Sequence, residues 1–329
     1  MKYPAVEAYR FYNESPEAGD FYREVIAGFS QYPRSIPPKY FYDEEGSRLF
    51  ESICEQPEYY LTRTEISLLE KHADDIRTFA GSDCYLVEPG SGSCEKVRLL
   101  LETLRPTAYV PMDISCAYLR SAAAGIATDY PWLDVHAVCA DITREVSLAF
   151  IPEQAAPVMF YPGSSIGNFD PDAATEFLIC LARIAGPGGG LLIGVDLKKD
   201  HATLHKAYND ARGITAAFNL NLLQRANREL DADFDMDAFE HHARYNSIAG
   251  RIEMQLTSTC KQTVNIDGHS FEFDAGESIH TENSYKYTND EFRSLAQRAG
   301  FTSCAVWTDS DRLFSLHFLR VDRKRPGET

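Results

Sequence analysis

Short, almost wholly apolar segments recur through the middle of this chain, with amphipathic stretches between most of them. The apolar segments cover residues 84–88, 108–112, 134–140, 157–161 and 190–196. The helical patterns cover residues 95–104, 117–128 and 172–185. Apolar runs without polar alternation are typical of parallel strands buried on both faces of a sheet. The pattern therefore predicts an α/β fold with a doubly wound, Rossmann-like sheet.

Two other patterns interrupt this alternation. Thr62 and Glu65 have the spacing of a capping box, which predicts that a long helix begins there. After the last apolar segment, residues 200–229 have a helical pattern and residues 248–282 a pattern of antiparallel strands. The whole segment from residue 200 to residue 282 looks inserted into the sheet domain.

The end of the chain returns to the first pattern. A helix is expected at residues 289–299, followed by strands at 304–308 and 313–321 that end the sheet in antiparallel fashion. We therefore expect a discontinuous sheet domain and a second, α+β domain on the substrate side. The expected division is residues 61–196 plus 287–329 for the sheet domain and residues 1–60 plus 197–286 for the second domain.

Composition narrows the possible partners and the compartment. With 32 Lys+Arg against 49 Asp+Glu, the net charge of −17 disfavours binding to nucleic acid. A chain start without an apolar core, and the lack of a long apolar run, predict a cytoplasmic protein without a membrane partner.

The eight cysteines are scattered without a Cys-x-x-Cys pair, so we expect them to be reduced and mostly structural. His201 and His205 lack a third ligand nearby in sequence, so no metal is expected. The sequence does not imply an oligomer.

The segment around Gly90 carries the sharpest local signal for a cofactor. An apolar strand ends in Glu88 and is followed by Gly90 and Gly92 in a Gly-x-Gly turn before a helix. Glycines permit a tight turn that brings backbone N–H groups close to a ligand, and the helix start favours an anionic group such as a carboxylate. A dinucleotide fingerprint requires a third glycine where Glu95 stands, which argues against NAD.

Three successive predicted strands end in an acidic residue. Glu88 ends the first, Asp113 the second and Asp141 the third. Ligands bind at the carboxyl ends of parallel strands, where Asp113 could accept ribose hydroxyls and Asp141 the amino group of adenine. The ordered set favours an adenosyl cofactor, S-adenosyl-L-methionine, over a dinucleotide.

Longer motifs carry a resemblance to a known family. They occupy residues 38–43, 46–50, 57–65, 163–169, 196–200, 207–210, 218–221 and 281–284. Together they resemble the L-histidine Nα-methyltransferases, which form hercynine in ergothioneine biosynthesis. The resemblance covers residues 32–320 and implies a class I methyltransferase domain with a family-specific domain that buries the amino acid.

The resemblance also implies roles for particular residues. The implied histidine-binding residues are Tyr59, Asn168, Tyr208, Glu282 and Ser284, with Tyr42 and Phe50 lining the pocket. The implied cofactor contacts are Gly90, Lys96, Asp113, Asp141 and Ile142. Met254 is a candidate contact for the ring of the substrate, although core packing is the simpler interpretation of a methionine in a strand.

The implied reaction is an in-line methyl transfer to a neutral amine, repeated three times. The ammonium group must first lose a proton, which Tyr42 or water could pass outward. Faces of tyrosine rings would tolerate the growing quaternary ammonium through cation–π attraction.

Three alternatives remain open at this point. The first is methylation of another amino acid or small amine. The second is a nicotinamide-dependent reductase with the same sheet, which Glu95 disfavours. The third is a relative that binds these ligands without catalysis.

Overall fold

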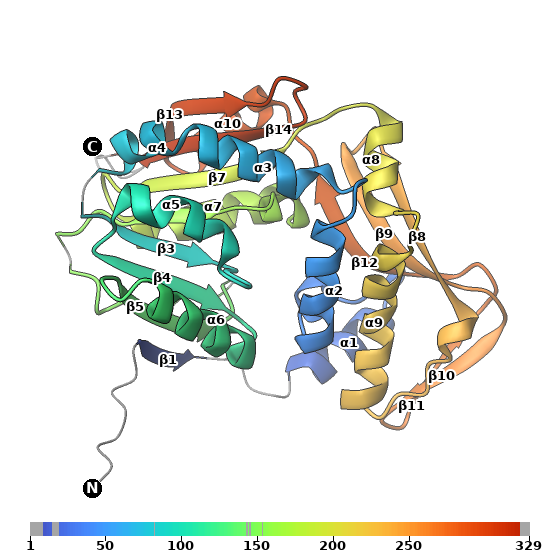
Figure 1. Cartoon of the computed structure of the whole chain (residues 1–329). Coiled ribbons are helices and arrows are strands. Elements are labelled where there is room, and N and C mark those ends of the chain that lie inside the picture. Colours follow the sequence, from blue (N-terminus) through green and yellow to red (C-terminus); the bar gives the residue numbers. More distant parts are fainter. Residues whose placement is uncertain are drawn as a thin grey trace, which may run out of the picture.

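The computed structural model describes residues 9–14, 20–81, 83–142, 144, 146–152 and 154–322. The larger of its sheets has eight strands: β1 (Arg10–Glu14), β3 (Tyr85–Pro89), β4 (Ala108–Asp113), β5 (Asp134–Ala140), β6 (Val158–Tyr161), β7 (Gly190–Asp196), β13 (Phe301–Thr308) and β14 (Phe314–Val321). Their order is β1-β5-β4-β3-β6-β7-β14-β13 (Figure 1). Strands β1, β5, β4, β3, β6 and β7 are parallel, β14 is antiparallel to β7, and β13 is antiparallel to β14.

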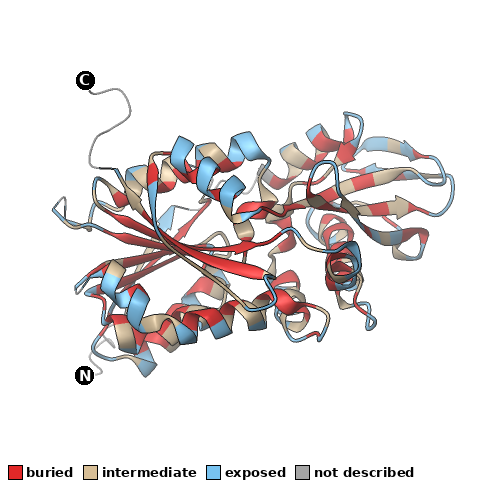
Figure 2. Cartoon of the chain, turned by 90° about the horizontal axis from the view of Figure 1, so that it is seen from above, coloured by how far each residue is buried: buried red, intermediate tan, exposed pale blue. Residues whose placement is uncertain are grey.

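Helices cover both faces of this sheet, and its strands are the most continuously buried part of the molecule (Figure 2). One face packs against α3 (Tyr60–Lys71), α4 (Ala73–Ala80), α5 (Glu95–Leu104) and α6 (Cys116–Asp129). The other packs against α7 (Pro171–Ala185) and α10 (Asn289–Arg298). Leu86 and Val87, adjacent on β3, lie in different core clusters and are both fully buried. The prediction of a doubly wound sheet is therefore confirmed.

A smaller sheet lies beside the carboxyl ends of the parallel strands (Figure 1). Its order is β2-β12-β9-β8, formed by β2 (Arg34–Ser35), β12 (Ser278–Tyr285), β9 (Arg251–Ser258) and β8 (Phe239–Asn246). The remaining elements are α1 (Asp20–Phe29), η1 (Pro38–Phe41), α2 (Glu44–Cys54), η2 (Ser165–Asn168), α8 (His201–Tyr208), α9 (Ile214–Glu229), η3 (Met236–Ala238), and a hairpin of β10 (Gln262–Ile266) and β11 (His269–Phe273).

The predicted antiparallel strands at 248–282 are present, but the pattern did not reveal β8, whose outer residues are largely polar. The predicted helix at 200–229 is two helices, because residues 209–213 form a turn between α8 and α9.

The backbone joins the two sheets directly. Tyr287 N donates to the carbonyl of Asp196 at 3.2 Å, and Lys198 N donates to the carbonyl of Tyr287 at 2.9 Å. The chain that leaves β12 therefore runs alongside the end of β7. Gly167 in η2 lies against the same joint, where a Cβ atom would come within 2.6 Å of the carbonyl oxygen of Tyr285. Side chains from β12 and from the carboxyl edge of the large sheet are thus brought together.

Two features of the chain before the first predicted strand differ from expectation. Strand β1 pairs in parallel with β5, so this part of residues 1–60 extends the large sheet. Helix α3 begins at Tyr60, not at a capping box, with Tyr59 as its N-cap residue. Because Tyr60 and Leu61 are buried, packing starts the helix before Thr62, and Glu65 lies inside it.

The expectation that all cysteines are reduced is wrong for two of them. Cys116 and Cys139 form a disulfide bond, with 5.2 Å between their Cα atoms. They are 23 residues apart in sequence, but β4 and β5 are neighbours, and Asp113 at the end of β4 is in register with Cys139. Strand adjacency therefore places the start of α6 beside β5. Among the described residues, none of the helices has the length and apolar character needed to cross a membrane.

Candidate active site

A pocket opens between the two sheets, and all eight residues predicted to bind the substrate or line its site are in its wall. They are Tyr42, Phe50, Tyr59, Asn168, Tyr208, Met254, Glu282 and Ser284. They come from seven different parts of the fold: the end of η1, α2, the start of α3, η2, α8, β9 and β12. The structure thus collects residues that are up to 242 positions apart in the sequence, between Tyr42 and Ser284. Their individual roles stay predictions.

One wall of the pocket is polar and comes from β12. Glu282 and Ser284 are two residues apart, so they share one side of the strand, and both are buried. Asn168 Nδ2 lies 3.4 Å from Glu282 Oε2, and the hydroxyls of Tyr208 and Ser284 are 2.8 Å apart. This wall offers hydrogen-bonding groups that a polar ligand could engage.

The opposite side is aromatic. The ring centroids of Tyr42 and Phe50 are 5.7 Å apart, and those of Phe50 and Tyr59 are 6.3 Å apart, both edge to face. The ring centroid of Phe218, in α9, is 5.9 Å from the ring centroids of both Tyr42 and Phe50. Several aromatic faces around one pocket are the arrangement that favours a cationic or quaternary ammonium group.

Burial controls the protonation of the polar groups. Burial, together with the nearby Glu282 carboxylate, raises the pKa of Tyr42 well above its ordinary value. Burial also raises the pKa of Glu282 to about 7, although the Lys286 ammonium opposes this shift. Tyr42 is therefore a neutral phenol at neutral pH, and Glu282 is close to half-ionised.

The predicted glycine turn has the backbone geometry expected of it. Gly90 and Gly92 have φ angles of 68° and 52°, in the region that glycine adopts most readily. Asp113 accepts from the backbone N–H of Gly92 at 3.0 Å and from that of Ser115 at 2.9 Å. The carboxylate at the end of β4 therefore fixes the turn beside it.

The other predicted cofactor residues surround the same turn, with different contacts. Asp141 accepts from Lys39 Nζ at 3.3 Å, and a Cβ atom on Gly90 would lie 3.7 Å from Cδ1 of Ile142. Glu88 is buried below the turn and accepts a hydrogen bond from the Tyr109 hydroxyl. Burial raises the pKa of Glu88 to about 8, even though this bond lowers it.

The chemistry of these groups fits an adenosyl sulfonium cofactor. Carboxylates at the ends of β4 and β5 can accept hydrogen bonds from hydroxyl and amino groups, whereas they would repel a pyrophosphate. A Cβ atom on Gly92 would meet nothing within 4 Å, so the turn has space beside it. The residues that would hold the cofactor stay those predicted from the sequence, and their individual roles stay predictions: Glu88, Gly90, Gly92, Lys96, Asp113, Asp141 and Ile142.

Sequence reasoning missed three residues in or next to the site, of which Phe218 lines the pocket. Glu65, interpreted as part of a cap, is fully buried and accepts from Lys96 Nζ at 2.6 Å and from Gly163 N at 2.8 Å. Phe218 lies within a family motif but was not chosen as a site residue. The two-residue spacing from Ser284 is the signal that could have drawn attention to Lys286, which lies one residue beyond the end of β12.

Comparison with known proteins matches this architecture to one family. The model of a family described as histidine-specific, S-adenosylmethionine-dependent methyltransferases matches residues 21–321. A histidine N-alpha-methyltransferase of Mycolicibacterium smegmatis is 44% identical, covering 89% of this chain and 92% of the relative. One of Mycobacterium tuberculosis is 41% identical over the same shares. Ergothioneine biosynthesis protein 1 of Neurospora crassa is 32% identical, covering 88% of this chain and 34% of the relative.

These matches confirm the resemblance and the expected cofactor, S-adenosylmethionine. The structure itself confirms the predicted antiparallel ending of the sheet, because β14 is antiparallel to β7 and β13 to β14. The chain belongs to the family of S-adenosylmethionine-dependent, histidine-specific methyltransferases.

Proposed function

We propose that this enzyme transfers three methyl groups in succession from S-adenosylmethionine to the α-amine of L-histidine, which yields hercynine, the betaine used in ergothioneine biosynthesis. The observation that carries the proposal is that all eight predicted residues line one pocket, in which Tyr42, Phe50 and Tyr59 form an aromatic enclosure. High identity to histidine N-alpha-methyltransferases along most of the chain supports the same substrate.

The pocket has complementary groups for each part of histidine. Asn168 and Tyr208 supply an amide and a hydroxyl that can bind the carboxylate. Glu282 and Ser284 can hydrogen-bond the two nitrogens of the imidazole, with Met254 directly opposite Glu282 in the β9–β12 register. A site that hydrogen-bonds a polar ring rejects apolar analogues strongly, because its buried polar groups would be left unpaired.

The α-amine must be neutral when it reacts. S-adenosylmethionine supplies an electrophilic methyl group, and the amine nitrogen must approach it in line. The raised pKa of Tyr42 excludes a tyrosinate base at neutral pH. Its hydroxyl can instead accept a hydrogen bond from the ammonium group and pass the proton to water.

The aromatic enclosure suits a product whose positive charge cannot be removed. Once three methyl groups are present, the nitrogen carries a permanent charge and no hydrogen-bond donor. The faces of Tyr42, Tyr59 and Phe50 can stabilise that charge without a hydrogen bond. The same surroundings therefore accept each intermediate of the series.

Two coarser features of the biology are part of the proposal. We propose a cytoplasmic enzyme, since its amino-acid substrate and its methyl donor are cytoplasmic metabolites. We also propose that it binds no nucleic acid, because a chain with a net charge of −17 repels a phosphate backbone. The division into residues 61–196 plus 287–329 and residues 1–60 plus 197–286 remains a proposal, apart from strand β1.

The deciding experiment is mass spectrometry of amino acids incubated with enzyme and S-adenosylmethionine. L-Histidine should gain one, two and finally three methyl groups, whereas the other amino acids and histamine should remain largely unmodified. Preferred methylation of tryptophan or tyrosine would favour the alternative of another amino-acid N-methyltransferase. Absence of any methylated product, with S-adenosylhomocysteine still bound, would point to a non-catalytic relative.

A further inference from the structure

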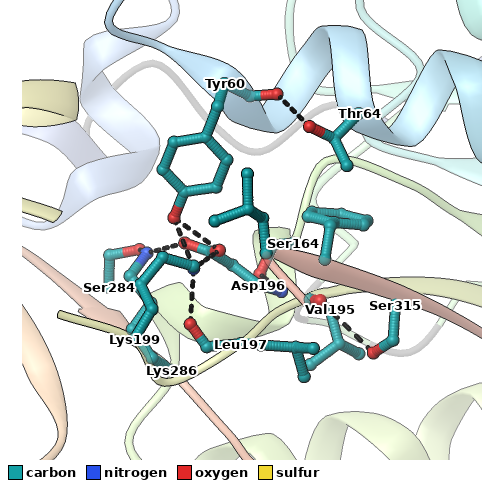
Figure 3. Close-up of polar contacts among 12 residues, drawn as sticks. Tyr60, Thr64, Ser164, Val195, Asp196, Leu197, Lys199, Ser284, Lys286 and Ser315 are labelled. Atoms are coloured by element: carbon teal, nitrogen blue, oxygen red, sulfur yellow. Dashed lines mark hydrogen bonds and ion pairs between the residues drawn. The ribbon is translucent and has the colours of Figure 1, made fainter. Parts of the chain in front are cut away.

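Lys286 lies directly behind the polar wall of the pocket and is almost completely buried. Its Nζ donates to the hydroxyl of Tyr208 at 2.8 Å and to that of Ser284 at 2.9 Å, and lies 2.8 Å from Asp196 Oδ2. Figure 3 shows Lys286 reaching between Ser284 and Asp196, at the joint of the two sheets. The ammonium thus donates to two hydroxyls that line the pocket and forms an ion pair with Asp196 behind them.

These contacts restrict the hydrogens of the two hydroxyls. An ammonium group can only donate, so the oxygens of Tyr208 and Ser284 must both act as acceptors toward Lys286. Each hydroxyl retains one hydrogen, and because the two oxygens are 2.8 Å apart, only one of these hydrogens can lie between them. The other hydrogen is directed away from the protein interior, which leaves a donor facing the pocket.

Behind the wall, two ammonium groups share one carboxylate, while the Glu282 carboxyl, on which the Lys286 charge also acts, belongs to the wall itself. Asp196 pairs with two ammonium groups, since Lys199 Nζ lies 2.5 Å from Oδ1 while Lys286 approaches Oδ2. Tyr60 adds a neutral hydrogen bond to the same Oδ1 at 2.7 Å (Figure 3). Burial would raise the pKa of Asp196, but the two lysines hold it below its ordinary value, so its carboxylate stays ionised.

An excess positive charge in a buried site is costly unless an anion approaches it. Lys199 faces Tyr60 and the carbonyl of Leu197, away from the pocket hydroxyls. The charge of Lys286, in contrast, acts on the pocket through Tyr208 and Ser284. A hydroxyl that accepts from an ammonium group becomes a stronger donor to an anion on its other side.

We propose that Lys286 is a positioning residue for the carboxylate of the amino-acid substrate: it orients the Tyr208 hydroxyl, directly and through Ser284, so that Tyr208 donates to the carboxylate, and it supplies the positive charge behind that hydroxyl. The inference rests on the proposed function, because it assumes that an amino acid occupies this pocket. It adds to that function a buried cation, Lys286, which does not line the pocket but favours an amino acid over an amine without a carboxylate.

The test compares L-histidine with histamine, which has the same ring and amine but lacks the carboxylate. Calorimetry on protein loaded with S-adenosylhomocysteine gives both affinities without turnover. Lys286→Met should weaken L-histidine binding at least about tenfold, because it removes a charge-assisted interaction, and should change histamine binding less than about threefold. In kinetics, KM for L-histidine should rise more than kcat falls.

Lys199→Met is the matched control. It removes the same charge from the same carboxylate but touches neither pocket hydroxyl, so the preference for L-histidine over histamine should be retained. Lys286→Gln keeps a hydrogen-bond donor without the charge and should lose an intermediate share of the preference. Thermal unfolding and S-adenosylhomocysteine binding show which variants are folded, and Lys286→Gln carries the test if Lys286→Met is not.

Equal losses for both ligands in Lys286→Met, or the same loss of preference in Lys199→Met, would overturn the inference. Wild-type protein that binds histamine as tightly as L-histidine would also overturn it, whatever the variants do. Mass spectrometry of the wild-type reaction separates the two proposals. If wild-type enzyme does not methylate L-histidine, the proposed function fails, whereas methylation with unchanged binding in a folded Lys286 variant removes only the role of Lys286.

Discussion

Glu65 is a buried residue of α3, and its carboxylate lies 2.6 Å from the ammonium of Lys96 in the first turn of α5. The same carboxylate accepts from the backbone N–H of Gly163, with distances of 2.8 and 2.9 Å to its two oxygens. One side chain therefore ties together α3, the helix that follows the glycine turn, and the loop that begins the pocket wall. The cofactor edge and the substrate pocket share this anchor.

Glu65→Gln should impair both ligand sites and stability. Removing one partner of a buried pair leaves the other charge uncompensated, and since Lys96 is partly exposed we expect a loss of about 2–3 kcal/mol in the free energy of unfolding. Denaturant unfolding and calorimetry with S-adenosylhomocysteine measure the two effects. Glu70→Gln, at an exposed position of the same helix, is the control. Equal behaviour of the two variants would show that the Glu65 anchor is unimportant.

Tyr42→Phe should slow methylation while preserving the aromatic enclosure. Without the hydroxyl, the ammonium proton loses its path outward, so kcat should fall by about 10- to 100-fold and mono- and dimethylated products should accumulate. Binding of S-adenosylhomocysteine should not change. Tyr22→Phe, on α1, serves as the control. Complete trimethylation at the wild-type rate would remove the proton role of this hydroxyl.

Glu282 should make the ligand-free protein less stable as the pH rises. Its pKa is raised from 4.5 to about 7 in the folded protein, so the folded state binds this proton more tightly than the unfolded chain does. The resulting stability is fully present below about pH 4.5 and is lost as the pH rises through about 7, by about 3 kcal/mol in all.

Glu282→Gln should therefore gain Tm relative to wild type at about pH 8 and much less at about pH 5. Glu272→Gln, which removes an exposed carboxylate from β11, is the control and should show no such difference between the two pH values. A pH-independent Tm difference for Glu282→Gln would contradict the raised pKa.

Glu282→Ala should weaken L-histidine binding far more than S-adenosylhomocysteine binding. Calorimetry that finds equal losses for the two ligands would argue against contact between Glu282 and the imidazole ring.

The bond between Cys116 and Cys139 should be detectable by counting thiols. Unfolded under non-reducing conditions, the protein should expose the six free cysteines out of eight, and all eight after reduction. Because the bond closes a loop of 23 residues, Cys139→Ser should cost about 3 kcal/mol in the free energy of unfolding. The exposed Cys260→Ser should cost nothing measurable. Eight reactive thiols before reduction would show that the bond is absent.

The sequence predicted the large sheet well because its signals are local. Every apolar run from residue 84 to residue 196 is a strand, and the carboxylates that follow three of these strands lie at one edge, since parallel strands end together. The glycines of the first turn were predicted for the same reason, because a positive φ angle is a property of the local backbone. Strand β8 was missed because its polar outer positions weaken the apolar alternation.

Family motifs named the pocket residues, but they could not show how these residues meet. Tyr42 and Glu282 are 240 positions apart, and only the packing of η1, α9 and β12 brings them into one pocket. The capping-box interpretation of Glu65 was wrong because burial of Tyr60 and Leu61 moved the start of the helix, which left the carboxylate free to bind Lys96.

The sequence by itself determined the order and type of most elements, the glycine turn and the acids at the strand ends, because each depends on the residues next to it. The tertiary structure alone decided the partners of buried charges: Glu65 with Lys96, and Asp196 with both Lys199 and Lys286. It also decided which cysteines lie close enough to bond. The physical reason is that a buried charge or thiol takes its properties from neighbours in space, and those neighbours are set by how distant helices and strands pack together.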